Sequence, residues 1–129
     1  MKHRKVVSCR EAPAAIGPYS QAVQVEDWVF ISGQIPLESN SGELVAGGIV
    51  AQAEQVMAHL GAILKAADLG FDALVKTTIY LVDLQDFAVV NEIYGRYFSV
   101  DLAPARATVQ VAALPKGALI EIEGIARRS

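Results

Sequence analysis

Cysteine, histidine and charged residues are all scarce in this sequence of 129 residues. The single cysteine, Cys9, cannot form an internal disulfide, and one thiol with the separated His3 and His59 cannot supply a structural zinc site. Charged residues make up 19% of the chain, against roughly 25% in an ordinary soluble domain. Hydrophobic residues make up 53%. This composition excludes a disulfide scaffold, a disordered chain and a coiled coil.

A long hydrophobic run is also missing. The longest stretch without a charged residue, 12–25, contains Pro13 and Pro18 and is shorter than the ~20 residues that span a bilayer. Because a small domain has little interior in which to hide apolar residues, we expect one domain, residues 1–129, that covers its apolar surplus with further copies of itself. No hydrophobic segment follows the basic residues Lys2–Lys5, so we interpret them as a solvated terminus and expect a cytoplasmic protein.

Positive charge does not dominate the sequence either. The net charge is −3, whereas proteins that bind nucleic acids generally carry a basic face. The glycine-rich phosphate-binding patterns and the H-E-x-x-H zinc pattern are absent. Gly47-Gly48 precedes a predicted helix, and we interpret it as a turn rather than as an anion site. A nucleic-acid partner, a metal and a nucleotide cofactor are therefore not expected.

Two β-rich runs, 21–25 and 28–35, are separated by Glu26-Asp27 and predict a hairpin. The second run is apolar on both of its alternating faces, with Trp28 and Phe30 on one and Val29 and Ile31 on the other. Helices can cover only one face of the sheet to which this strand belongs. We expect the other face to meet a second subunit.

From Ile49 to Ala67, apolar residues recur in steps of three and four and predict an amphipathic helix that Gly70 stops. The opposite face of this helix carries Gln52, Gln55 and His59, which we expect to be solvated.

The second half of the chain predicts a strand over 75–82, a helix from an Asp86 cap through Phe98, and strands over 107–111 and 119–126. The order of strands, helix, strand, helix and strands indicates an α+β fold in which two helices pack on one sheet.

Two glutamates in the last predicted strand are candidates for proton transfer. Glu121 and Glu123 are two residues apart, so both side chains leave the same face of the strand. Two like charges on a partly desolvated face would raise the pKa of one carboxyl. The alternative is a solvated strand face on which Lys76 or Arg127 pairs with these carboxylates.

Arg106 follows Pro104-Ala105 and enters an apolar strand, so we expect its stem to be buried. A guanidinium in that setting can bind a carboxylate through a bidentate fork, although a lone arginine is more often an ion-pair residue. Thr108 shares its face of the strand by the period of two.

The sequence as a whole resembles the reactive-intermediate deaminase (Rid) family. The residues that carry the resemblance are Ala12–Gln21, Ile31–Pro36, Val75–Leu84, Phe87–Asn91, Pro104–Val109, Leu114–Lys116 and Ile120–Glu123. The resemblance implies a chorismate-mutase-like fold with about six strands, assembled as a homotrimer with clefts between subunits. It also implies cofactor-independent hydrolysis of the 2-imino acids that pyridoxal-phosphate dehydratases release, yielding 2-oxo acids and ammonia.

The resemblance also assigns roles to individual residues. Arg106 would bind the substrate carboxylate, and Glu121 would orient and deprotonate the attacking water. Tyr19 would close the cleft and donate a hydrogen bond. The remaining contacts would come from Ala107, Thr108, Gly33, Ser32 and Asn91.

One departure from the family concerns Thr108, where many members carry a cysteine. Threonine preserves the activity if the position works through its backbone. Two alternatives remain open: a trimeric module that binds small carboxylates without turnover, and an endoribonuclease, which the acidic net charge disfavours. The register of the last two strands leaves open whether Arg106 and Glu121 reach one cleft from one subunit or from two.

Overall fold

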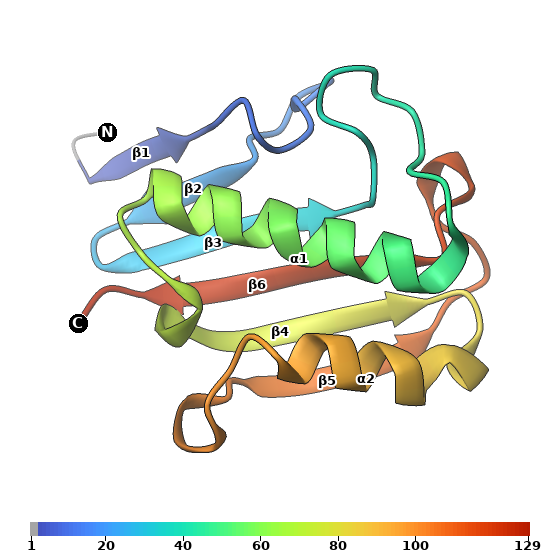
Figure 1. The fold of residues 1–129 in the computed structure, drawn as a ribbon. Helices are drawn as coiled ribbons and strands as arrows, with labels where there is room; N and C mark the ends of the chain where they lie inside the picture. The colour runs from blue at the N-terminus through green and yellow to red at the C-terminus, as the bar shows by residue number, and fades with distance from the viewer. Residues whose placement is uncertain (1–2) are drawn as a thin grey trace.

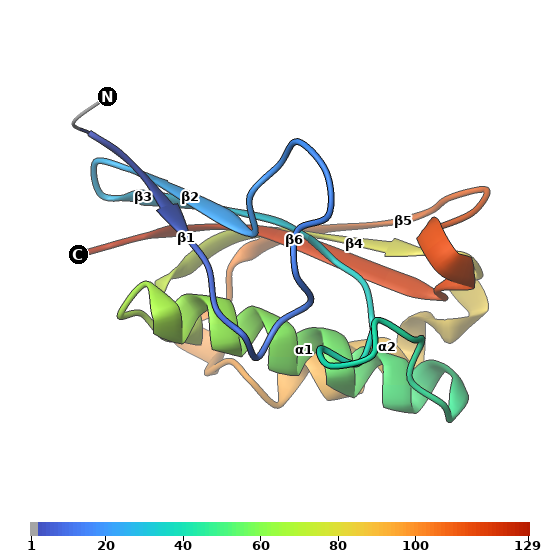
Figure 2. The same cartoon turned by 90° about the horizontal axis from the view of Figure 1, so that it is seen from above.

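Six strands form one mixed sheet in the computed structural model, which describes residues 3–129. The strands and helices are β1 (Arg4–Val7), β2 (Ala22–Val25), β3 (Trp28–Gln34), α1 (Gly48–Ala66), β4 (Leu74–Leu81), α2 (Phe87–Gly95), β5 (Ala105–Gln110) and β6 (Ile120–Arg127). Both helices lie on the same face of the sheet, as Figures 1 and 2 show. The predicted α+β class and the two helices on one face are confirmed.

The strand order is β1-β2-β3-β6-β4-β5, which places β6 in the interior of the sheet (Figure 1). β6 runs antiparallel to both β3 and β4. β4 and β5 are parallel, and α2 provides the crossover that a parallel pair requires. β5 is therefore an edge strand, and one side of its backbone faces away from the sheet.

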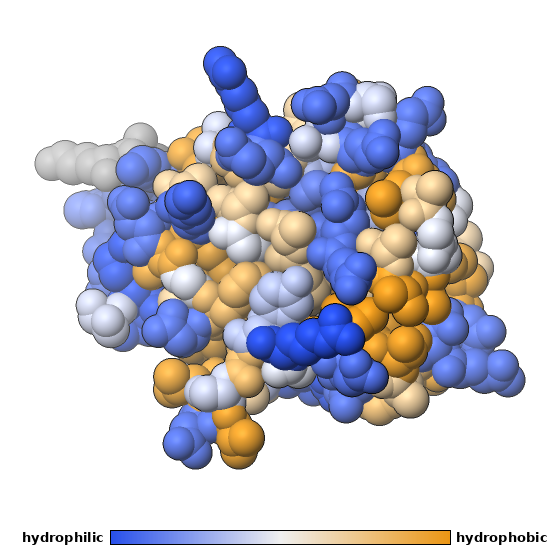
Figure 3. Space-filling view, in the orientation of Figure 1, coloured by the Kyte–Doolittle hydropathy of each residue, from blue (hydrophilic) through white to orange (hydrophobic). Residues whose placement is uncertain are grey.

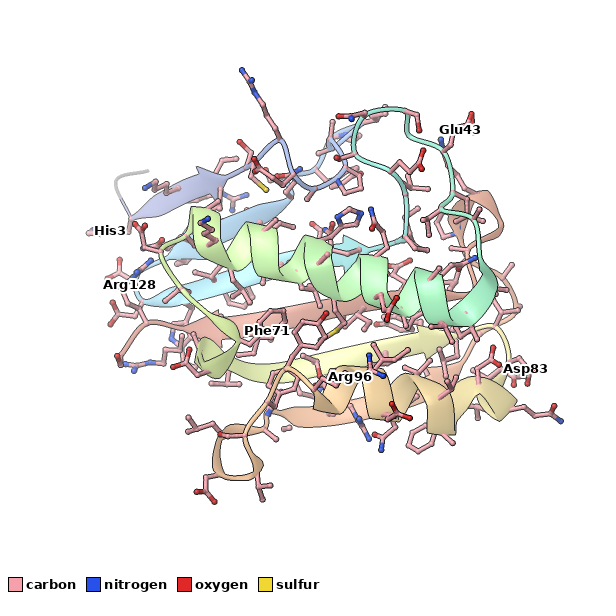
Figure 4. The ribbon with its side chains drawn as sticks, viewed as in Figure 1. His3, Glu43, Phe71, Asp83, Arg96 and Arg128 are labelled. Carbon is pink, nitrogen blue, oxygen red and sulfur yellow. The ribbon has the colours of Figure 1, made fainter. Side chains whose placement is uncertain are left out.

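The core lies between the sheet and the two helices. Val56, Leu60 and Ile63 of α1 are fully buried, as the predicted spacing requires, and they face buried residues such as Ile79 of β4 and Ile122 of β6. On the outer side of the helices, Arg96 pairs with Glu92 at 2.7 Å and with Glu54 of α1 at 3.6 Å (Figure 4).

Both predicted helices end earlier than expected. α1 stops at Ala66 because Asp68 adopts a left-handed conformation, with φ at 60°, and Gly70 lies beyond this turn. Asp86 does not cap α2 with its side chain; Asp83 instead accepts a 2.9 Å hydrogen bond from the N–H of Gln85 at the start of the preceding 3₁₀ turn. The helix then ends at Gly95, three residues before the predicted Phe98.

The predicted solvation of two polar segments was partly wrong. On α1, Gln52 and His59 are buried, since loops cover the helix face that was expected to meet solvent. Near the N-terminus, Arg4–Val7 forms an edge strand paired with β2, although the Arg4 and Lys5 side chains stay exposed. His3 is exposed and pairs with Glu26 at 2.9 Å, whereas Lys2 lies outside the described residues.

The sheet face opposite the helices is uncovered and carries apolar side chains. This was predicted from the run 28–35, which is apolar on both of its alternating faces. Trp28 and Phe30 of β3 are 40% and 46% exposed, whereas Val29 and Ile31, which face the helices, are buried. Val6 of β1 and Val109 of β5 are also exposed, and we call this surface the open face. On the helix side, apolar residues gather mainly toward the N-terminal ends of α1 and α2 (Figure 3). None of the helices described is long and apolar enough to cross a membrane.

Candidate active site

Glu121 lies on the open face of β6 with Glu123 two residues away, as predicted. Both side chains are half-buried, and burial, with a smaller contribution from the charge of Glu123, raises the pKa of Glu121. Neither Lys76 nor Arg127 neutralises Glu123. Its carboxylate instead accepts a 3.0 Å hydrogen bond from the hydroxyl of Tyr80 on β4. The structure therefore supports a carboxyl that exchanges protons closer to neutrality than an ordinary glutamate.

Gly33 lies against the Glu121 carboxylate. The pairing of β3 with β6 shifts between Ile31 and Gln34, which is a β-bulge at Ser32-Gly33. A Cβ added at Gly33 would collide with the Glu121 side chain, so only glycine leaves room for the carboxylate in its present position. The hydroxyl of Ser32 donates a 2.6 Å hydrogen bond to the Ser20 carbonyl, which fixes the bulge against the preceding loop.

Tyr19 lies in this loop and is more than half exposed. Together with Gly33 it lines a pocket of about 630 Å³. The left-handed Gly17, with φ at 126°, precedes it, and the N–H of Tyr19 donates to the Gly17 carbonyl at 2.9 Å. The phenol hydroxyl is thus placed at the pocket by a tight turn rather than by packing of its ring.

Arg106 of β5 is held by three residues of α2. Its Nη1 donates a 2.7 Å hydrogen bond to Oδ1 of Asn91. Its guanidinium lies 5.5 Å from the ring centre of Phe87 and 5.1 Å from that of Tyr94, both within cation–π range. The hydroxyls of Tyr94 and Thr77 are hydrogen-bonded at 2.6 Å, which fixes the second ring. The guanidinium keeps further N–H groups for a ligand.

Thr108 lies beside Arg106 on the same face of β5. Its buried Oγ1 has no hydrogen-bond partner within residues 3–129. An unpaired buried hydroxyl is costly, so Thr108 holds an unused hydrogen-bonding group beside Arg106. Ala107, between the two, directs its side chain to the open face and can contribute only backbone groups to the Arg106 side.

The structure does not bring Arg106 and Glu121 together within one chain. Arg106 pairs in register with Thr77, whose side chain is buried under the helices, whereas Glu121 pairs with Tyr80, which faces the opposite side. β4 also separates β5 from β6. The candidate residues therefore form two half-sites: the Glu121 half-site with Gly33, Ser32 and Tyr19, and the Arg106 half-site with Asn91, Thr108 and Ala107.

Phe87 and Tyr94 were not predicted as neighbours of Arg106. The signal was present, because Phe87, Asn91 and Tyr94 are spaced by four and three residues and share one helix face. Tyr94 also belongs to the core. Among residues 3–129, no three His, Cys, Asp or Glu side chains gather closely enough to hold a metal ion.

Comparison with known proteins places this geometry in a family. The family model described as Endoribonuclease L-PSP matches residues 9–128. A mouse protein named 2-iminobutanoate/2-iminopropanoate deaminase is 58% identical over 95% of this chain and 90% of its own length.

Solved structures agree with these matches. A putative endoribonuclease from Thermotoga maritima superposes with a TM-score of 0.93 at 46% identity, covering 97% of this chain and 98% of its own. TdcF of E. coli, solved with bound serine, gives a TM-score of 0.90 at 43% identity over 97% of this chain and 99% of its own. The match over nearly the whole chain, in sequence and in fold, shows that it belongs to the endoribonuclease L-PSP family, which includes the reactive-intermediate deaminases.

Proposed function

We propose that this protein hydrolyses 2-iminobutanoate and 2-iminopropanoate to the corresponding 2-oxo acids and ammonia. The mouse relative that is 58% identical carries the name of this activity. The observation that carries the proposal within the structure is Arg106, a guanidinium fixed by Asn91 with N–H groups left free for a small carboxylate. The E. coli relative with bound serine is a protein of this fold that accommodates a molecule of the same size and with the same carboxylate.

The complete site requires a second copy of the chain. Arg106 and Glu121 leave opposite faces of the sheet, so one subunit cannot present both to one small substrate. The exposed Trp28 and Phe30 supply an apolar surface for association, and Arg106 sits on the edge strand β5, from which it can reach a neighbour. These features support a homotrimer in which the Arg106 half-site of one subunit meets the Glu121 half-site of the next.

The two half-sites perform different parts of the reaction. Arg106 binds the substrate carboxylate, and the backbone of the edge strand β5 near Ala107 and Thr108 holds the rest of the molecule. This contact orients C2 of the substrate toward the neighbouring subunit. Asn91 maintains the guanidinium in its binding orientation, so little side-chain entropy is lost when the substrate arrives.

Glu121 supplies the base. In its ionised form it accepts a proton from a water molecule as the water oxygen bonds to C2, and it passes this proton to the imine nitrogen as the C=N double bond becomes single, which gives a neutral carbinolamine. Glu121, ionised again, then accepts the proton of the carbinolamine hydroxyl as the C=O double bond forms, and it transfers that proton to the nitrogen, which leaves as ammonia. The raised pKa suits a group that must both accept and release a proton near neutrality. Tyr19 donates a hydrogen bond to the developing oxygen at C2.

The experiment couples the protein to a pyridoxal-phosphate-dependent threonine dehydratase and follows 2-oxo acid formation in the presence and absence of the protein. We expect a clear acceleration, which Arg106→Ala abolishes while the oligomeric state is unchanged. An unchanged rate with the wild-type protein would contradict the deaminase and favour a carboxylate-binding module. Loss of added RNA in a nuclease-free preparation would instead favour the endoribonuclease.

The setting of the reaction follows from its substrate. A 2-imino acid is unstable in water and has to be intercepted where it is released. We therefore place the protein in the compartment of a dehydratase that produces such imines, which we expect to be the cytoplasm.

A further inference from the structure

His59 is a buried titratable residue that the proposed reaction does not use. Its side chain lies on α1, and the residue is 2% exposed. In Figure 2, the segment that follows β1 descends to the level of α1 and then rises past the sheet. Figure 1 shows the loop after β3 running beside α1 before it leads into the N-terminal end of that helix. His59 meets both segments, through Leu37 in the loop after β3 and Glu11 in the segment after β1.

The imidazole of His59 holds the loop after β3. Its Nε2 lies 2.6 Å from the carbonyl oxygen of Leu37, and because a carbonyl only accepts, this nitrogen carries the proton. Gln55, one helical turn earlier, donates to the same oxygen from Nε2 at 3.1 Å. Two side chains of α1 therefore converge on a single carbonyl, in the loop where Leu37 also forms a β-bridge with Leu44.

The other side of the ring faces the segment that follows β1. The backbone of Glu11 lies beside the ring, and burial lowers the pKa of His59 and so favours its neutral form. The same segment is fixed by Gln21, whose amide bonds to backbone atoms of Cys9, Ala12 and Pro13 at 2.7–3.3 Å. One buried side chain thus contacts both segments.

These two segments are the walls of the pocket of about 630 Å³ at Tyr19 and Gly33. Pro13, Ala14 and Ile16 come from the first wall, and Leu37 to Gly42 from the second. Pro13, Ile16 and Leu37 give the two walls an apolar part, which suits the alkyl group of a 2-imino acid.

We propose that His59, supported by Gln55, is a positioning residue that sets the separation of these two walls and thereby determines which substrate side chains the site accepts. The inference rests on the proposed deaminase function, because it assigns the pocket to the side chain of that substrate. It assigns no proton transfer to His59, whose ring is sealed from the pocket by the backbone that it binds.

The test compares three variants on the same helix. His59→Leu keeps a buried side chain but removes the hydrogen bond to Leu37, and His59→Gln restores an N–H donor with similar reach. Ile63→Ala is the control, because it opens the core beneath α1 and removes no hydrogen bond to either wall. For each variant, kcat/KM is measured with 2-iminopropanoate and with a straight-chain 2-imino acid two methylenes longer, both generated in place by an amino-acid oxidase.

We expect His59→Leu to change the ratio of the two kcat/KM values by about threefold or more, since each methylene in an apolar pocket contributes about tenfold when it fits well. His59→Gln should return the ratio toward wild type, and Ile63→Ala should lower the melting temperature without changing the ratio. A wild-type ratio in His59→Leu, with only the melting temperature reduced, would overturn the inference.

A binding measurement separates this inference from the proposed function. The dissociation constants of 2-oxobutanoate and 2-oxohexanoate need no turnover, so they are measured for the same variants. If the wild-type protein shows no deamination, the proposed function fails. The inference still stands if His59→Leu shifts the ratio of these two constants, and it falls if the ratio is unchanged.

Discussion

Nη1 of Arg106 on β5 donates a 2.7 Å hydrogen bond to Oδ1 of Asn91 on α2, fifteen positions earlier in the chain. The bond fixes one arm of the guanidinium and leaves its remaining N–H groups for a carboxylate. A strand and the helix that crosses over to it thus build a binding group that neither element could orient alone.

Asn91→Ala removes the acceptor that fixes Arg106. We expect KM to rise about fivefold with little change in kcat. The hydrogen bond to the charged guanidinium holds it in place for the substrate, and its loss costs about 1 kcal/mol or more of binding free energy. Steady-state kinetics on 2-iminobutanoate give kcat and KM separately. Glu92→Ala is the matched control, since Glu92 is the next residue on α2 and pairs with Arg96 instead. An equal loss in kcat would assign Asn91 to the chemical step.

Glu123→Gln should shift the acid limb of the pH–rate profile to lower pH. The charge of Glu123 helps to raise the pKa of Glu121, and the base works in its ionised form, so activity rises as pH increases through that pKa. Removing the charge lowers the pKa, and the amide oxygen can still accept the hydrogen bond from Tyr80. The profile of kcat/KM for the free enzyme is the measurement. A shift to higher pH would contradict the assignment of Glu121 as the base.

The same raised pKa predicts a change in stability. A carboxyl with a higher pKa in the folded state favours folding most at pH values below its unfolded pKa, and this contribution is lost as pH rises through the folded pKa. Glu121→Gln cannot ionise, so we expect its stability relative to wild type to improve over that window and to remain level above it. Urea unfolding at a series of pH values measures the difference.

Gly33→Ala should reduce kcat at least tenfold by displacing the Glu121 carboxylate. The backbone at Gly33 does not require a glycine conformation, so the obstacle to a Cβ is the side chain of Glu121. The expected result is a well-folded protein with the oligomeric state of the wild type and a displaced carboxylate, tested by kinetics beside circular dichroism. Shortening the neighbour removes the collision, so Gly33→Ala combined with Glu121→Ala should be no less stable than Glu121→Ala alone.

Phe30→Glu should abolish both association and activity, because it places a charge on the open face, on which we propose that the subunits associate. Light scattering measures the mass, and the coupled dehydratase assay the activity. Val50→Glu is the control, since Val50 of α1 is exposed to a similar degree, 45% against 46% for Phe30, but lies on the helix side. A monomeric Phe30→Glu that retained full activity would contradict the shared site.

The sequence predicted what depends on short-range periodicity. The alternation around Val29 and Ile31 identified the strand and its open face, and the three-and-four spacing through Leu60 identified α1. The same reasoning predicted that Glu121 and Glu123 share a face, and it offered a raised pKa for one of the two carboxyls beside the alternative of a solvated face. The strand, the helix and the shared face depend only on neighbours within a few positions, whereas the raised pKa of Glu121 comes mainly from burial.

What the sequence could not predict depends on segments distant along the chain. His59 is polar and lies opposite the apolar stripe, so nothing local indicates that the segments after β1 and β3 bury it. Likewise, the sheet faces to which the Arg106 and Glu121 side chains point depend on how the strands pair, including the insertion of β6 between β3 and β4. This pairing joins segments that are distant along the chain.

The central position of β6 also has a consequence for folding. β3 and β4 are not hydrogen-bonded to each other and are joined only through β6, whose residues come after those of the other strands described. Without β6, strands β1 to β3 and strands β4 and β5 would form two separate groups, each with an unpaired edge. The sheet becomes continuous only when residues 120–127 insert between these two edges.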